Sequence, residues 1–327
     1  MDNNFSAPWN IQQQKNATAE DIFYCFRLIL GRAPNQEEWK GHVAQAGANI
    51  NSVVGSYVNS LEFSRRLTTF LHAQPDSRIT LKDLKDFSIY VQDTDSAVGQ
   101  HIKNSGEYEP HVTTVFRDRL KAGMHVLDIG ANIGYFSMLS ASLVKATGSV
   151  MAIEPNPNNA KLLEASRRAN AFDNVLIVQA AAGREAGLLV LNTSHSNGTT
   201  AALSSDLRSL IDSTTVPCFK IDDIVSKDKQ IDFVKIDVEG AEYNALFGTS
   251  DIISRCHPTI VSEFSPDLMP GISGVNGPQY LEFLLNFGYK ISVIELDDRL
   301  TDCGNDVAKV MAAYTHSGVD HIDLLMT

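Results

Sequence analysis

The chain has 327 residues, enough for two domains, and its 43% hydrophobic and 20% charged residues are typical of a globular protein. A formal net charge of −12 at pH 7 argues against general nucleic-acid binding, because that affinity depends on neutralising phosphates with Lys and Arg. The four cysteines include no CxxC pair, which argues against the usual zinc and redox motifs.

Other features of the chain favour a cytoplasmic location. The first 14 residues are polar and lack the apolar segment of a secretory signal peptide. No apolar run reaches the roughly 18 residues that a membrane-spanning helix needs, so no transmembrane segment is expected. We expect the widely separated cysteines to be reduced thiols.

The first part of the chain predicts a small all-helical domain. Residues 1–16 are rich in Asn and Gln and are expected to form a flexible tail. Ile22, Phe26 and Leu30 recur at helical spacing, and Val53 and Tyr57 belong to a second apolar stripe. The helical domain is predicted over 17–74, with a linker at 73–77 and a second domain over 79–327.

The second domain alternates short apolar runs with helical stretches. This alternation predicts an α/β fold: a doubly wound, mostly parallel sheet that is covered by helices on both faces. The predicted strands are 87–91, 126–129, 149–153, 175–180, 187–192, 233–236, 259–263, 290–294 and 321–326. The predicted helices are 109–120, 135–146, 158–169, 241–247 and 277–287. Ligands of such sheets bind beyond the carboxyl ends of the strands, at the switch point.

A glycine turn follows the predicted strand 126–129. It reads Asp-Ile-Gly-Ala-Asn-Ile-Gly from Asp128 to Gly134, and its small residues let the backbone approach a ligand. Asn132 occupies the place of the second glycine of the dinucleotide motif, which favours a smaller polar group such as the methionine part of S-adenosylmethionine. The structural alternative is a turn that only packs a helix on a strand.

The next two strand ends complete a predicted cofactor site. Glu154 lies 24 residues after Gly130, where a carboxylate can accept hydrogen bonds from ribose hydroxyls. Small side chains from Ala180 to Gly183 leave room for an adenine ring, although simple packing explains them equally well.

Acidic residues gather at the ends of two later strands. Asp237, Glu239 and Glu242 follow the predicted strand 233–236, and Glu263 ends the strand 259–263. Asp237, Glu239 and Glu263 are therefore candidates for a general base, a metal site or a substrate contact. We expect Glu242 to stabilise the following helix instead.

Together these motifs resemble FkbM-type methyltransferases over about 79–327. The resemblance rests on the turn 128–134 with the following Tyr-Phe-Ser, Glu154-Pro-Asn, Lys235-Ile-Asp-Val-Glu-Gly-Ala-Glu, Glu263 and the segment 106–110. It implies a Rossmann-like fold, S-adenosylmethionine as methyl donor and transfer to a hydroxyl oxygen. Carried over to this chain, it implies that the cofactor contacts Glu109, Asp128, Gly130, Asn132, Gly134, Glu154, Pro155 and Ala181. Asp237, Glu239 and Glu263 would line the acceptor side.

The helical domain has a resemblance of its own. Leu28-Ile-Leu-Gly-Arg-Ala-Pro and Ser60-Leu-Glu-Phe are similar to a phycobilisome-linker-like module, which accompanies enzymes of surface-polysaccharide assembly. This association implies a carbohydrate or other small-molecule acceptor, or a protein partner of the helical domain.

Several alternatives remain open from the sequence. Asp237 is the first choice as the base that takes the hydroxyl proton. Alternatively, a divalent cation bound by the acid trio (Asp237, Glu239 and Glu263) would activate the hydroxyl. A non-catalytic scaffold and an NAD-dependent oxidoreductase are the rival functions. The Ser- and Thr-rich segment 192–215 is long enough to act as a lid.

Overall fold

The computed structural model describes residues 15–63, 79–93, 95, 98–192, 199–203, 206, 210–211 and 213–327. Most of the predicted tail and the predicted linker at 73–77 lie outside these residues. The chain divides into two compact units, Met1–Ser77 and Arg78–Thr327. Among the described residues, no helix is both long and apolar enough to cross a membrane.

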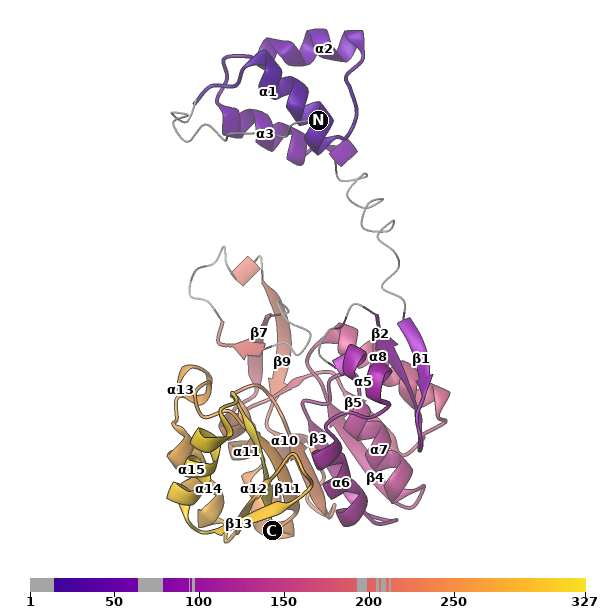
Figure 1. Ribbon diagram of the computed structural model, residues 1–327, viewed down its shortest axis with the longest axis vertical. Helices are drawn as coiled ribbons and strands as arrows, with labels where there is room; N and C mark the ends of the chain where they lie inside the picture. Colours follow the sequence, from indigo (N-terminus) through magenta and orange to yellow (C-terminus); the bar gives the residue numbers. More distant parts are fainter. Residues whose placement is uncertain are drawn as a thin grey trace. The chain divides into compact units, whose positions relative to one another are not determined.

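The N-terminal unit is built from short helices (Figure 1). These are α1 (Ala19–Tyr24), the π-helical turn η1 (Cys25–Ile29), α2 (Gln36–His42), the short turn η2 (Val43–Gln45) and α3 (Ile50–Val58). Thr18 and Asn35 begin α1 and α2 with reciprocal hydrogen bonds to the third residue of the helix, which satisfy free backbone N–H groups. Ile22, Phe26 and Tyr57 are buried together in its core.

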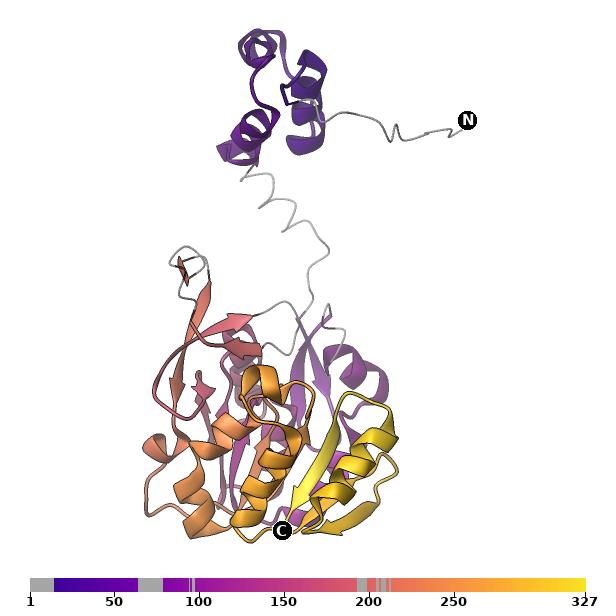
Figure 2. The same ribbon diagram turned by 90° about the vertical axis from the view of Figure 1, so that its left-hand side faces the viewer.

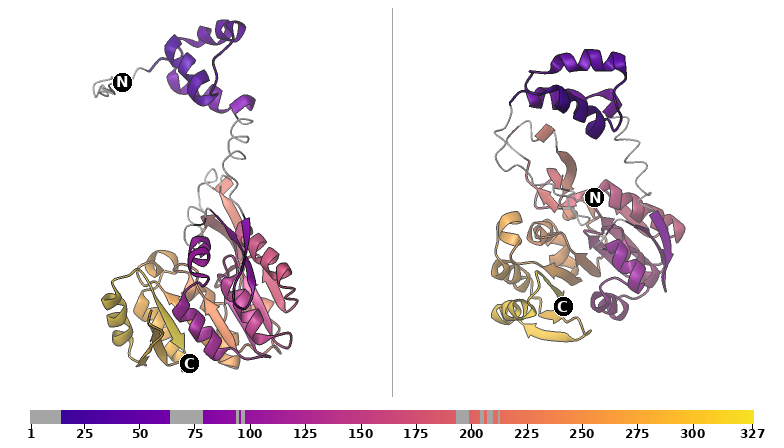
Figure 3. Two further views of the ribbon diagram at one scale, coloured as in Figure 1. Left: turned by 45° about the vertical axis from the view of Figure 1, so that its right-hand side comes forward. Right: turned by 45° about the horizontal axis from the view of Figure 1, so that its top comes forward.

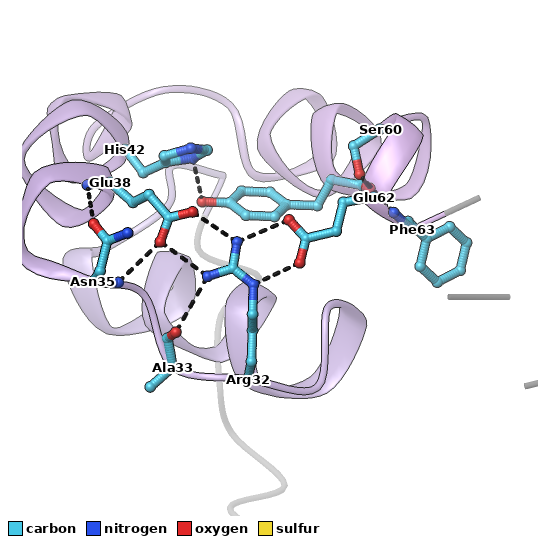
Figure 4. Close-up of polar contacts among 9 residues, drawn as sticks. Arg32, Ala33, Asn35, Glu38, His42, Ser60, Glu62 and Phe63 are labelled. Atoms are coloured by element: carbon cyan, nitrogen blue, oxygen red, sulfur yellow. Dashed lines mark hydrogen bonds and ion pairs between the residues drawn. The ribbon is translucent and has the colours of Figure 1, made fainter. Parts of the chain in front are cut away.

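Arg32 joins the segments of this unit (Figure 4). Its guanidinium donates to Glu38 at 2.7 Å and to Glu62 at 2.5 Å. Figure 4 also shows the ring of His42, whose Nδ1 lies 2.7 Å from the hydroxyl of Tyr57. The hydrogen bond from Arg32 is the main reason why the pKa of Glu38 is lowered to about 2.

An eight-stranded sheet forms the centre of the second unit, in the order β13-β12-β14-β11-β10-β3-β4-β5 (Figure 1). Its strands are β3 (His125–Ile129), β4 (Ser149–Ile153), β5 (Val175–Val178), β10 (Phe233–Ile236), β11 (Thr259–Phe264), β12 (Ile291–Ile294), β13 (Leu300–Gly304) and β14 (Ile322–Met326). The five strands from β11 to β5 are parallel, whereas β14, β12 and β13 pair antiparallel. The sheet is therefore mixed, and its antiparallel part is larger than the sequence suggests.

Helices cover both faces of this sheet and confirm the doubly wound, Rossmann-like fold. One face packs on α5 (Val98–Ser105), α6 (Pro110–Arg119), α7 (Tyr135–Val144) and α8 (Pro157–Ala169). The other packs on α10 (Ile221–Ile224), α11 (Glu242–Phe247), α12 (Ser250–Cys256), α13 (Met269–Ile272), α14 (Gly277–Asn286) and α15 (Val307–Ser317). Figure 2 shows α14 and α15, in orange and yellow, side by side.

Two smaller sheets flank the main one. The hairpin of β1 (Ile79–Asp83) and β2 (Ser88–Gln92), purple in Figure 3, hydrogen-bonds to α8 through Ser166 and to the following Asn170. The other sheet has the order β6-β9-β7-β8 and contains β6 (Ala181–Ala182), β7 (Gly187–Asn192), β8 (Thr199–Ala201) and β9 (Thr214–Phe219). The predicted strand 187–192 therefore exists but belongs to a separate sheet.

Candidate active site

A cavity of about 280 Å³ lies at the carboxyl ends of the parallel strands. The strand order reverses between β3 and β10, because β4 and β5 extend the sheet on one side and β11 on the other. The cavity is lined by residues that follow β3, β4 and β10, and by the end of β11. It therefore occupies the switch point at which α/β sheets bind their ligands.

Gly130 brings two neighbouring loops of this cavity into contact. Its φ is +84°, and a Cβ at this position would lie 1.8 Å from the carbonyl oxygen of Asp237. Only glycine fits here, so the turn after β3 touches the backbone of the loop after β10.

Gly134 and Asp128 were predicted to contact the cofactor, but both are occupied by contacts within the protein. A Cβ on Gly134 would meet Leu163 at 2.1 Å, so this glycine allows α7 to pack against α8. Asp128 is completely buried and accepts a hydrogen bond from Ser137 at 2.5 Å. Neither residue lines the cavity, whereas Gly130 and Asn132 do.

Glu154 binds the backbone of both loops that flank it. Its Oε2 accepts from the N–H of Asn132 and its Oε1 from the N–H of Asn156, each at 2.8 Å. Burial raises the pKa of Glu154 to about 7. Glu154 also accepts a hydrogen bond from the side chain of Asn159. A carboxylate has about four lone-pair positions, so one remains for a ligand hydroxyl.

The three predicted acids lie together at the other side of the cavity. One carboxylate oxygen from each of Asp237, Glu239 and Glu263 lies within 4.8 Å of the others. Burial, followed by the charges of Asp237 and Glu239, raises the pKa of Glu263 well above its ordinary value. The trio therefore gathers three carboxyls at one point of the cavity, a set suited to acid and base chemistry.

Lys235 has a role in the site that was not predicted from the sequence. It is buried in β10, its Nζ lies 3.0 Å from Oδ2 of Asp237 and it faces the ring of Phe136. Burial lowers the pKa of Lys235, but the charges of Asp237, Asp128 and Glu109 together raise it above the ordinary value. The lysine therefore neutralises part of the acidic cluster. A lysine inside an apolar strand is unusual enough to indicate a buried ion pair from sequence.

Glu109 lies on the same side of the cavity as the acid trio. It precedes Pro110 at the start of α6 with a left-handed φ of 41°. Burial, followed by the charge of Asp323, raises its pKa to about 7. Pro155 and Ala181 also line the cavity, and Thr200 of β8 contributes from the smaller sheet.

Glu242 has a structural role, but it bonds the loop that precedes α11, whereas we expected it to stabilise the helix itself. It begins α11, and its Oε1 accepts from the backbone N–H groups of Val238 and Gly240 at 3.0 and 3.1 Å. It does not line the cavity but holds the loop that carries Glu239.

Comparison with solved structures gives several similar chains. An FkbM methyltransferase from Methylobacillus flagellatus is 15% identical with a TM-score of 0.41, and the match covers 93% of this chain but only 58% of that one. A precorrin-6y C5,15-methyltransferase from Geobacter metallireducens is 14% identical over 75% of this chain and 98% of its own, also with a TM-score of 0.41. Fibrillarin from Aeropyrum pernix, with bound S-adenosyl-L-methionine, is 12% identical over 76% and 100%, with a TM-score of 0.40.

No curated protein matches the chain. The family model of the methyltransferase FkbM domain matches residues 128–291, about half of the chain. This segment begins at the glycine turn and includes Glu154 and all three acids of the trio. A methyltransferase family, not an NAD-dependent oxidoreductase, accounts for the motifs, and the chain belongs to the FkbM methyltransferase family.

Proposed function

We propose that the chain transfers the methyl group of S-adenosylmethionine to a hydroxyl oxygen of a sugar, a glycan or a related metabolite. One observation carries this proposal: the glycine turn, Glu154 and the acid trio all line a single cavity. A donor held at the turn and an acceptor held at the acids would then meet inside it.

The residues of the turn fit the cofactor that the family implies. Gly130 brings the backbone of the turn to the cavity wall, and the remaining lone-pair position of Glu154 suits a ribose hydroxyl. Asn132, Pro155 and Ala181 would hold the cofactor alongside them. When bound, S-adenosylmethionine supplies an electrophilic methyl carbon on a positively charged sulfur.

Asp237 is the proposed general base. The acceptor oxygen forms a bond to the methyl carbon as the carbon–sulfur bond breaks, and Asp237 takes the hydroxyl proton. The ion pair with Lys235, 3.0 Å from Nζ to Oδ2, fixes the direction of the Asp237 carboxylate. Alignment of the two substrates supplies most of the acceleration.

A divalent cation on the acid trio is the second route to the same reaction. Three carboxylate oxygens within 4.8 Å of one another are an arrangement that a hard cation accepts. Such a cation would lower the pKa of the acceptor hydroxyl in place of a protein base. Dialysis against a chelator separates the routes, because only the second loses activity and regains it with Mg²⁺.

The variant Asp237→Asn tests the proposal. We expect transfer to fall by about 10²–10⁴-fold, as for the loss of a general base, while titration calorimetry shows unchanged cofactor binding. Asp173→Asn makes the same change at a fully exposed side chain outside the cavity and is expected to retain activity. Unchanged turnover in Asp237→Asn would remove this residue from the mechanism. Cofactor binding without transfer in the parent chain would favour a non-catalytic scaffold.

The cellular setting and the partner of the N-terminal unit belong to the proposal as well. The four thiols are free, which supports a reducing compartment such as the cytoplasm. The family match does not extend to the N-terminal unit, and a protein-binding role for its helices stays a prediction.

A further inference from the structure

A second cavity, of about 700 Å³, adjoins the candidate active site. Its walls come from the end of β12, the start of β14 and the last turns of α15. Asp320 and His321 line both cavities, so these two residues form a wall that the two spaces share.

The register of the strands explains why the cavities share one rim. Because β14 is antiparallel to β11, its first residue, Ile322, pairs with Phe264 at the carboxyl end of β11. Because β12 is antiparallel to β14, its last residue, Ile294, also reaches this edge and pairs with Asp323. The second cavity therefore lies at the same edge of the sheet as the first. It is beyond Glu263, on the side of β11 that faces away from β4 and Glu154.

The walls of the second cavity are acidic, and their one arginine is paired with a carboxylate. The lining contains four acids, Glu295, Asp297, Asp320 and Asp323, against one arginine, Arg299. Arg299 lies 2.7 Å from Asp297. Such a wall offers hydrogen-bond acceptors to hydroxyl groups and repels anions.

Three histidines line the wall, His111, His316 and His321, and acids engage the first and the last of them. His111 lies 2.8 Å from Asp323, and His321 lies 2.8 Å from Asp320. Burial lowers the pKa of His111, while the hydrogen bond and charge of Asp323 raise it above its ordinary value overall. A protonated His111 is therefore compensated by its partner and adds no net positive charge for a phosphate.

We propose that the second cavity binds the body of the methyl acceptor, and that this acceptor is a neutral or cationic hydroxyl compound without phosphate. The inference rests on the proposed methyl transfer and narrows its substrate class. The cavity volume falls within the roughly 300–1,000 Å³ of small-molecule sites. Apolar side chains such as Val293 and Val319 provide surfaces for the carbon skeleton, while the acids bind hydroxyls. The acceptor hydroxyl then reaches Asp237 past His321.

Ser317→Trp tests the location of the acceptor, with Thr315→Trp as its matched control. Both side chains are exposed in the last turns of α15, and each hydroxyl bonds to a backbone carbonyl of the same helix. Only Ser317 lines the cavity. We expect Ser317→Trp to reduce transfer at least tenfold and Thr315→Trp to leave it within twofold, with equal cofactor binding by calorimetry. Leu296→Trp, at an 81% exposed position of the same cavity, is expected to repeat the loss.

Anion exchange tests the chemical class of the acceptor. The chain is incubated with tritium-labelled S-adenosylmethionine and a small-molecule and glycan extract of its source cells, and the products are fractionated. Label in the unretained fraction, lost with Ser317→Trp, is the expected result. Label in a retained, phosphatase-sensitive fraction would overturn the acceptor class, and equal transfer by both tryptophan variants would overturn the location. Absence of label from every fraction, despite cofactor binding, would instead reject the proposed methyl transfer itself.

Discussion

At the residue scale, Glu154 holds the backbone of two loops and is also proposed to bind the cofactor. Both of its oxygens already accept backbone N–H groups, and its pKa of about 7 places the change of charge near neutral pH. Ribose hydroxyls donate hydrogen bonds, so they favour the deprotonated form. Cofactor binding and proton release at Glu154 are therefore coupled.

This coupling predicts a pH dependence of cofactor affinity. As pH rises from 6 to 8 through the pKa of Glu154, affinity should increase, by up to about tenfold per pH unit below that pKa. Calorimetric titration with S-adenosylmethionine at several pH values measures this slope. In Glu154→Gln we expect about 10–100-fold weaker binding, from the loss of a charged hydrogen-bond acceptor, and a flatter profile. An identical slope in both proteins would assign the titration to another group.

Gly130 gives a second prediction at the residue scale. In Gly130→Ala the new Cβ would strike the carbonyl oxygen of Asp237, so the two loops must separate. We expect a loss of about 3 kcal/mol or more in the free energy of unfolding, together with weaker cofactor binding. Gly123→Ala is the control, because Gly123 has a similar φ of +92° but only one ordinary contact. It should cost about 1–2 kcal/mol, the price of a left-handed backbone, and leave binding unchanged. Urea unfolding and calorimetry of both variants measure these effects.

At the scale of elements, the local patterns of the chain predicted much of the sheet. The alternation of apolar runs and helices located β3, β4, β10 and β11, because parallel strands buried on both faces are continuously apolar. These four strands also deliver most of the predicted site. The glycine turn and the acids could be placed because each directly follows a strand whose carboxyl end lies on the same rim.

Pairings between distant segments could not be predicted in the same way. β14 is the last strand of the chain but lies between β11 and β12, and no local pattern encodes that order. The bond between His111 and Asp323 joins residues 212 positions apart. The second cavity depends on both, so sequence reasoning missed it. The close approach of Leu163 to Gly134 could not be predicted either, because it depends on how α7 and α8 pack together.

The segment that contains β8 gives a prediction about how ligands change its accessibility to a protease. Thr200 lines the first cavity, and β8 belongs to the segment 192–215 that we expect to act as a lid. Residues 193–198, 204–205, 207–209 and 212 of this segment lie outside the described residues. Cofactor together with acceptor should therefore slow proteolytic cleavage within 192–215 by about tenfold or more, as local opening is suppressed. Limited proteolysis with mass spectrometry measures this. Equal cleavage with and without ligands would exclude a lid, while cuts at other exposed loops serve as the internal reference.

At the scale of the whole molecule, the division into two units predicts separate unfolding transitions. The site residues all belong to the second unit, so S-adenosylhomocysteine should raise only that transition. At 100 times its dissociation constant the ligand adds about 2.7 kcal/mol to the stability of the unit that binds it. Differential scanning calorimetry measures both transitions.

Arg32→Ala assigns the other transition. It removes the ion pairs with Glu38 and Glu62 and should lower only the melting temperature of the N-terminal unit. Exposed pairs are worth about 0–1 kcal/mol each, so a shift of a few degrees is expected. A single transition that moves as a whole with ligand would mean that the units unfold together.

The contact between Gly130 and the backbone at Asp237 also bears on how such an enzyme can acquire new substrates. A substitution that reshapes either loop disturbs the partner loop. In the proposed site, donor binding and proton transfer therefore cannot change independently. The second cavity, between β12 and α15, lies away from this contact. The linings of the two cavities have Asp320 and His321 in common. If the acceptor binds in the second cavity, as proposed, variation there would exchange one acceptor for another while methyl-donor chemistry is retained. Directed evolution for a new acceptor should therefore begin with libraries at positions such as Leu296, Ser317 and Val319.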